Sequence, residues 1–125
     1  MAIPVLVVDD SAPIREMIAS LLAPRGYRIV TAENGIQALE KLRLEAAACI
    51  VLLDVVMPGL DGIAVVRAIN EDVSLRHIGH RIILMSAPLR LAARDIPTTT
   101  GQLPKPFTRQ QLLQTIELFS GQDAT

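Results

Sequence analysis

The sequence predicts an α/β fold, a doubly wound, five-stranded parallel sheet with helices on both faces. Short, wholly aliphatic runs recur along the chain, as is typical of strands that are buried on both faces of a parallel sheet. Segments with apolar residues at helical spacing alternate with these runs. Half of the 125 residues are hydrophobic and only 2% are aromatic, so we expect one domain with an aliphatic core.

The first strand is expected over Ile3–Val8, a continuous aliphatic run. Ser11 then offers an N-cap, and Pro13 fits the first turn of a helix, where a missing N–H does no harm. Pro24 ends this helix, and a second strand is predicted at Tyr27–Ala32.

A second helix should follow the Asn34-Gly35 turn and lead to Cys49–Leu53, an apolar run that predicts a central strand ending at Asp54. Residues 58–62 are rich in proline and glycine and predict a loop before the third helix. The apolar positions of the second and third helices are Ile36, Leu39, Leu42, Ile63, Val66 and Ile69.

After a polar stretch, Ile82–Met85 predicts the fourth strand. Leu89–Arg94 fits one short or irregular fourth helix, which Pro97 and three threonines interrupt. A brief strand is expected around Gln102–Leu103, and Thr108 should cap the last helix. The apolar positions of that helix are Leu112, Leu113, Ile116 and Phe119.

The bulk composition excludes several classes of protein. The 12 basic and 13 acidic residues nearly balance, so a nucleic-acid-binding surface is not expected. No apolar stretch approaches the roughly 20 residues of a membrane span. Cys49, the single cysteine, is expected to be a small buried hydrophobe and fits a reducing compartment. We therefore expect a cytoplasmic protein with one domain over residues 1–125 and no effector domain in this chain.

Polar residues follow four of the predicted strands. Asp9 and Asp10 follow the first strand, Asp54 the third, Ser86 the fourth and Lys105 the fifth. Carboxyl ends of parallel strands meet at one edge, where ligands of doubly wound folds bind. Three carboxylates placed together repel one another without a cation, and Mg²⁺ prefers such oxygen ligands. A carboxylate is also a possible nucleophile for a phosphoryl group.

These residues, with the motifs around them, resemble the receiver domains of bacterial response regulators, the CheY-like family. The resemblance covers nearly the whole chain and implies the flavodoxin-like strand order 2-1-3-4-5. It is carried by Asp9-Asp10, Asp54, Met57-Pro58-Gly59, Asp61-Gly62, Ser86-Ala87 and Lys105-Pro106-Phe107, with Gly26-Tyr27, Ala32, Gly35 and Ala38-Leu39.

The resemblance implies a signalling switch of a two-component system or phosphorelay. Asp54 would accept a phosphoryl group from a histidine kinase or a histidine phosphotransfer protein. Asp10 would bind Mg²⁺ directly, with Asp9 helping through water. Asp54 and the backbone carbonyl of Val56 would complete the protein's part of the metal site. Phosphorylation would change the surface that binds an unknown downstream protein, with a homodimer as one outcome.

Ser86 would hydrogen-bond the phosphoryl group, and Lys105 would pair with its charge. Gln102 stands where the family often has an aromatic switch residue, so half of the usual switch is missing. Val56 and Pro88 occupy two positions beside the acceptor where relatives often carry polar side chains, and we expect them to tune the lifetime of the phosphoryl group.

Two other functions stay open. The first is a receiver-shaped interaction module that works without phosphate. Gln102 and the short fourth helix keep this hypothesis open, while the intact acidic cluster and the lysine argue against it. The second is a Mg²⁺-dependent phosphohydrolase, but Val56, two residues after Asp54, has no group for proton transfer, so we do not expect a turnover enzyme. His77 and His80 have a spacing that metals use, yet no complete ligand set, and we expect them in a solvated loop.

Overall fold

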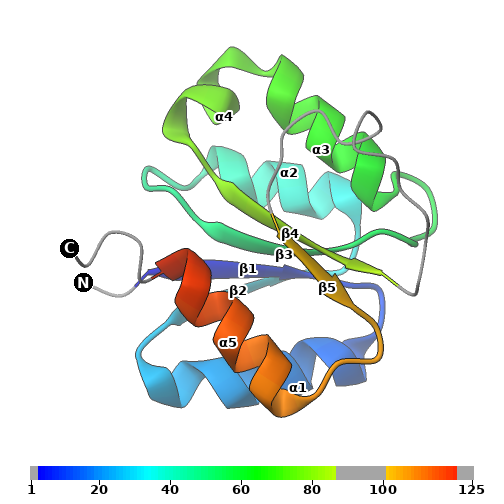
Figure 1. The fold of residues 1–125 in the computed structure, drawn as a ribbon. Coiled ribbons are helices and arrows are strands. Elements are labelled where there is room, and N and C mark those ends of the chain that lie inside the picture. Colours follow the sequence, from blue (N-terminus) through cyan, green and yellow to red (C-terminus); the bar gives the residue numbers. More distant parts are fainter. Residues whose placement is uncertain (1–2, 87–100, 121–125) are drawn as a thin grey trace.

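The chain folds as the predicted α/β structure, and the computed structural model describes residues 3–86 and 101–120. The sheet has five parallel strands in the order β2-β1-β3-β4-β5 (Figure 1). Its strands are β1 (Pro4–Val8), β2 (Arg28–Ala32), β3 (Ile50–Asp54), β4 (Arg81–Ser86) and β5 (Gly101–Pro104). The helices are α1 (Ala12–Leu22), a 3₁₀ turn η1 (Ala23–Arg25), α2 (Gly35–Arg43), α3 (Gly62–Glu71), α4 (Val73–Ile78) and α5 (Arg109–Ser120).

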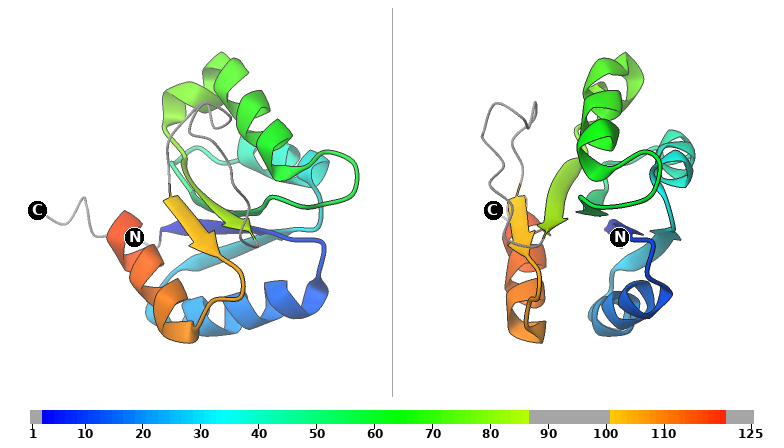
Figure 2. Two further views of the ribbon diagram at one scale, coloured as in Figure 1. Left: turned by 45° about the vertical axis from the view of Figure 1, so that its right-hand side comes forward. Right: turned by 90° about the vertical axis from the view of Figure 1, so that its right-hand side faces the viewer.

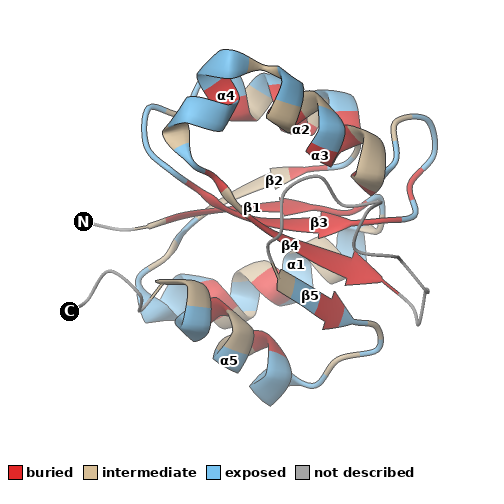
Figure 3. Ribbon diagram, turned by 45° about the horizontal axis from the view of Figure 1, so that its top comes forward, coloured by how far each residue is buried: buried red, intermediate tan, exposed pale blue. Residues whose placement is uncertain are grey.

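The helices form two layers, with α1 and α5 on one face of the sheet and α2, α3 and α4 on the other (Figures 1 and 2). Residues of β3 alternate between the two faces: Val51 and Leu53 pack with the α2–α4 layer, while Ile50 and Leu52 pack with α1 and α5. The central strands β1, β3 and β4 are therefore buried on both faces, as their continuous aliphatic runs predicted, whereas the edge strands β2 and β5 are partly exposed (Figure 3).

Strand register brings the predicted site together. Val8 is paired with Leu53, so the residues that follow β1 lie beside the end of β3. Asp54 is paired with Met85, and Ser86, the last residue of β4, is paired with Pro104. Because all strands are parallel, these four chain segments end at the same edge of the sheet.

Side-chain caps begin four of the helices, α2, α3, α4 and α5. Asn34 Oδ1 accepts from the backbone N–H of Gln37 at 2.9 Å, and Asp61 Oδ1 accepts from that of Ala64 at 2.9 Å. At α5, Thr108 Oγ1 accepts from the Gln111 N–H at 3.1 Å, as the sequence predicted for this residue. Ser11 occupies the N-cap of α1, but its side chain makes no capping hydrogen bond.

The prediction of a polar loop between the third helix and the fourth strand is wrong in part, because this segment contains helix α4. Asp72 caps α4 through a 3.2 Å bond from the Leu75 N–H, and Gly79, with φ of 81°, ends it. None of the helices in the described part of the chain is long and apolar enough to cross a membrane. The predicted helix at Leu89–Arg94 lies outside the described residues.

The burial of two side chains differs from the sequence prediction, and that of a third agrees with it. Ile36 was expected on the apolar face of α2 but is 64% exposed, since Ala38, Leu39 and Leu42 form the buried face. His80 was expected in solvent but is buried, where its Nδ1 accepts a 3.0 Å hydrogen bond from the Cys49 N–H. Cys49 is the predicted buried hydrophobe, and burial raises the pKa of its thiol to about 11.

Candidate functional site

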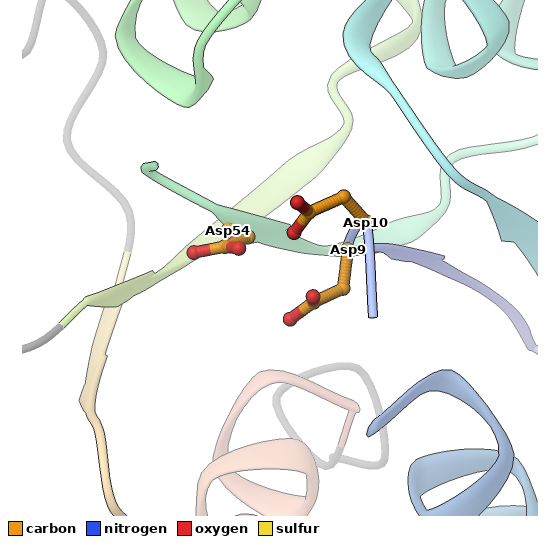
Figure 4. A group of neighbouring side chains, drawn as sticks. All are labelled: Asp9, Asp10 and Asp54. Atoms are coloured by element: carbon orange, nitrogen blue, oxygen red, sulfur yellow. The ribbon is translucent and has the colours of Figure 1, made fainter. Parts of the chain in front are cut away.

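Three carboxylates gather at the carboxyl ends of β1 and β3 (Figure 4). Asp9, Asp10 and Asp54 each offer one oxygen, and these oxygens all lie within 4.8 Å of one another. Asp9 and Asp54 are buried, whereas Asp10 is exposed. The strand register thus makes the acidic cluster that the sequence predicted.

Asp9 is the best-anchored member of this cluster. Its Oδ1 accepts from the Ser11 N–H at 2.9 Å, and its Oδ2 accepts from Lys105 Nζ at 2.8 Å. Its own N–H donates to the Ala32 carbonyl at 3.2 Å, which extends the pairing of β1 with β2 by one residue. Its carbonyl accepts from Arg15 Nη1 at 2.5 Å. Every polar group of Asp9 therefore has a partner.

The carboxylate of Asp54 is less well compensated. Its Oδ1 accepts from the Val56 N–H at 3.3 Å and lies 3.4 Å from Lys105 Nζ. Burial raises the pKa of Asp54, and the negative charge of Asp9 raises it further, while Lys105 offsets these effects only in part. The acceptor candidate is thus a desolvated carboxylate that a second cation would stabilise.

Lys105 reaches this cluster from the connection between β5 and α5. Its N–H donates to the Ser86 carbonyl at 2.6 Å, and the peptide bond to Pro106 is cis. Desolvation lowers the pKa of Lys105, but the hydrogen bond to Asp9 and the charges of Asp9 and Asp54 outweigh it, so the pKa is raised overall. Lys105 therefore carries a positive charge in the site.

The other predicted site residues lie around this cluster. Ser86 is buried at the end of β4, while Val56 is 67% exposed beside Asp54. Gln102 is exposed on β5, where it is paired with Leu84, two residues before Ser86. Pro88 lies outside the described residues. The structure therefore brings together Asp9, Asp10, Asp54 and Lys105, with Gln102 on the neighbouring edge strand.

Two residues that the sequence prediction did not assign to the site support it. Gly62, at the start of α3, leaves no room for a side chain, because a Cβ there would lie 2.5 Å from the Asp54 carbonyl oxygen. Arg15 binds the Asp9 carbonyl from the first turns of α1. The Asp61-Gly62 pair was a visible signal of a close approach, but the Arg15 contact depends on side-chain geometry that the sequence pattern does not contain.

The donor set suits a hard divalent cation. All candidate ligand atoms are oxygens, and three carboxylates face a single lysine, so negative charge remains in excess. Mg²⁺ prefers one or two carboxylates together with water and phosphate oxygens. The residues present therefore fit Mg²⁺.

An apolar pocket of about 410 Å³ adjoins the acidic cluster. Lys105 forms one wall, so the pocket and Asp54 share a side chain. Its other lining residues come from α1 and from the segment after β5, namely Ile14, Met17, Pro106 and Phe107.

Comparison with known proteins gives a consistent result over most of the chain. A sequence model of the response regulator receiver domain matches residues 5–117. Chemotaxis protein CheY of Bacillus subtilis is 34% identical over 123 residues, covering 93% of this chain and 96% of that protein. Response regulator MprA of Mycobacterium ulcerans is 35% identical over 118 residues, covering 90% of this chain but 48% of MprA. The chain thus spans about half the length of some curated relatives that it matches.

A solved structure agrees with these sequence relatives. The receiver domain of the sensor histidine kinase PA1611 from Pseudomonas aeruginosa superimposes with a TM-score of 0.79 at 26% identity. The match covers 97% of this chain and 99% of that domain, whose structure has a magnesium ion coordinated in its active-site cleft.

Proposed function

The chain belongs to the response regulator receiver domain family, and from this premise we propose that Asp54 is the phosphoacceptor of a two-component or phosphorelay switch. One observation carries the assignment of the residue. Asp9 and Asp54 are both buried beside Lys105, but both oxygens of Asp9 are taken up by hydrogen bonds of 2.9 and 2.8 Å. Among the described residues, Asp54 accepts only one longer bond, of 3.3 Å from the Val56 N–H, and lies 3.4 Å from the lysine ammonium, so its carboxylate is the one left available to react. That environment suits a nucleophile whose product carries additional negative charge.

In the proposed reaction, a carboxylate oxygen of Asp54 attacks the phosphorus of a phosphohistidine on a partner. The phosphorus–nitrogen bond breaks, and the histidine nitrogen leaves with the electron pair and takes a proton from solvent. Asp9, Asp10 and Asp54 would hold Mg²⁺ together with the Val56 carbonyl, and the ion would neutralise the charge on the phosphoryl oxygens.

Lys105 and Ser86 would act on the product of this reaction. Lys105 is already within 3.4 Å of Asp54, so a short movement of its flexible side chain would pair it with a phosphoryl oxygen. Ser86 ends the strand next to β3 and would donate its hydroxyl hydrogen to another oxygen. Gln102 is exposed on β5, so its polar amide stays solvated and it would not fill a buried space as an aromatic ring does.

The apolar pocket beside Lys105 would be a docking site for the protein that donates the phosphoryl group. A phosphohistidine partner, either a histidine kinase or a phosphotransfer protein, must bring its phosphoryl group to the edge where Asp54 lies. Met17, which is 42% exposed, and the pocket around it would receive apolar side chains near that histidine. Such a contact would orient the donor over Asp54.

Incubation with acetyl phosphate and Mg²⁺, followed by intact-mass spectrometry, tests the assignment. We expect one added phosphoryl group in the wild type and none in Asp54→Asn. Asp61→Asn is the matched control, because Asp61 is exposed and asparagine still caps α3.

The same experiment separates the alternatives. An adduct that persists in Asp54→Asn would overturn the assignment of the residue. A wild type that never forms an adduct would support an interaction module that works without phosphate. Continuous consumption of acetyl phosphate without a lasting adduct would support a phosphohydrolase.

A further inference from the structure

Arg15 of α1 makes a contact that places it behind the acidic cluster. Its Nη1 donates a 2.5 Å hydrogen bond to the carbonyl oxygen of Asp9, and its side chain is 17% exposed. This carbonyl belongs to the peptide group that links Asp9 to Asp10. A largely buried arginine therefore holds the one peptide unit between two of the three clustered carboxylates.

We infer that Arg15 is a positioning residue for the divalent cation, a role that rests on the proposed function of the cluster. Pairing with β2 ends one residue after β1, at Asp9, whose N–H bonds the Ala32 carbonyl. Asp10 lies beyond this pairing and is exposed, and within residues 3–86 and 101–120 its carboxylate has no hydrogen-bond partner. The direction of the Asp10 side chain therefore depends on the orientation of the peptide group before it, which the Arg15 bond fixes.

The contact with Glu33 does not explain the placement of Arg15. The two side chains approach only to 4.0 Å, and Glu33 is 59% exposed, so solvent screens their attraction. The bond to the Asp9 carbonyl is short and half-buried, and it is a charge-assisted bond from a guanidinium. The stronger of the two contacts is thus the one that faces the carboxylates.

Charge and positioning predict opposite effects of removing Arg15. The guanidinium is a positive charge close to the cation site, so its loss alone would strengthen Mg²⁺ binding. Loss of the fixed peptide orientation would weaken binding, because Asp10 would have to be ordered by the ion itself. The direction of the change in Mg²⁺ affinity therefore distinguishes a positioning role from a purely electrostatic or structural one.

Isothermal titration of the metal-free protein with MgCl₂ tests the inference without any phosphorylation. We expect Arg15→Ala to raise the Kd for Mg²⁺ on the order of tenfold, the size of effect seen when groups that orient metal ligands are removed. Arg15→Met keeps an unbranched stem for packing but has no donor, and it should raise the Kd similarly. Arg25→Ala removes an exposed arginine of η1 and should leave the Kd unchanged.

Circular dichroism melting without Mg²⁺ establishes that each variant is folded before its Kd is compared. An unchanged or smaller Kd in a folded Arg15 variant would overturn the inference. A wild type that does not bind Mg²⁺ would instead overturn the metal site of the proposed function. The two failures are therefore distinguishable.

Discussion

Lys105 Nζ donates a 2.8 Å hydrogen bond to Oδ2 of Asp9, a carboxylate that is 1% exposed. The lysine approaches Asp54 less closely, at 3.4 Å. One ammonium thus connects two buried carboxylates from neighbouring strands and compensates part of their mutual repulsion. This relationship leads to a prediction about stability.

Lys105→Met should destabilise the metal-free domain by about 1–3 kcal/mol, below the usual loss for a fully buried pair because Lys105 is 23% exposed. The reason is that Asp9 and Asp54 would then face each other without a cation. Urea unfolding at neutral pH measures the change. Arg67→Met, at an exposed position of α3, is the control, and equal stability of Lys105→Met and wild type would contradict the prediction.

Mg²⁺ should raise the melting temperature of the domain, because the native cluster holds the ion and the unfolded chain does not. Asp10→Ala should remove most of this rise, since it deletes one of the three oxygen donors. Differential scanning fluorimetry over a millimolar Mg²⁺ series provides the measurement. An undiminished rise in Asp10→Ala would mean that the ion binds elsewhere.

Val56→Asn should shorten the lifetime of the phosphoryl group. Val56 is 67% exposed beside Asp54, so an asparagine has room there and could orient a water toward phosphorus. Loss of the adduct with time, followed by intact mass after removal of the donor, gives the rate. A decay as slow as in the wild type, or slower, would count against this role of Val56.

Stability should fall as the pH decreases below about 6.5, because burial lowers the pKa of His80 below its ordinary value. The unfolded state then binds a proton that the folded state resists, so the loss extends from the ordinary pKa of 6.5 down to the lowered folded pKa. Its slope is at most about 1.4 kcal/mol per pH unit for one proton. The nearby charge of Glu45 opposes part of this shift.

His80→Asn tests this, because an amide oxygen would still accept from the Cys49 N–H but does not titrate. Urea unfolding between about pH 5 and pH 7.5 should show a smaller slope in the variant than in the wild type. Asp54 acts in the opposite direction, because its pKa is raised, so the difference between the two proteins isolates His80. His77→Gln, on the exposed side of α4, is the control. Identical slopes in His80→Asn and wild type would refute the prediction.

Most of the fold could be predicted from the sequence because its central strands β1, β3 and β4 are continuous aliphatic runs and its main helices have apolar residues at regular spacing. The site could be predicted for a related reason. Asp9, Asp10 and Asp54 directly follow or end strands, and parallel register brings such residues to one edge. The family resemblance of these positions added the strand order.

The remaining features depend on tertiary contacts. Helix α4 is six residues long with only Leu75 buried, so it has too few turns for an apolar period, although Asp72 and Gly79 were capping signals. The burial of His80 depends on a backbone N–H that lies 31 positions earlier in the chain. Nothing in the local pattern around His80 contains that partner.

The sheet divides the interior into two apolar clusters that have no buried side chain in common. The pocket residues Ile14 and Phe107 pack on the α1–α5 cluster alone. In evolution, this arrangement separates substitutions in the α1–α5 cluster from substitutions in the α2–α4 cluster. If the pocket receives the donor as proposed, substitutions that adapt it to a new donor would leave the packing of α2, α3 and α4 untouched. On the proposed function, donor specificity would then diverge among such domains while the residues at the strand ends stay the same.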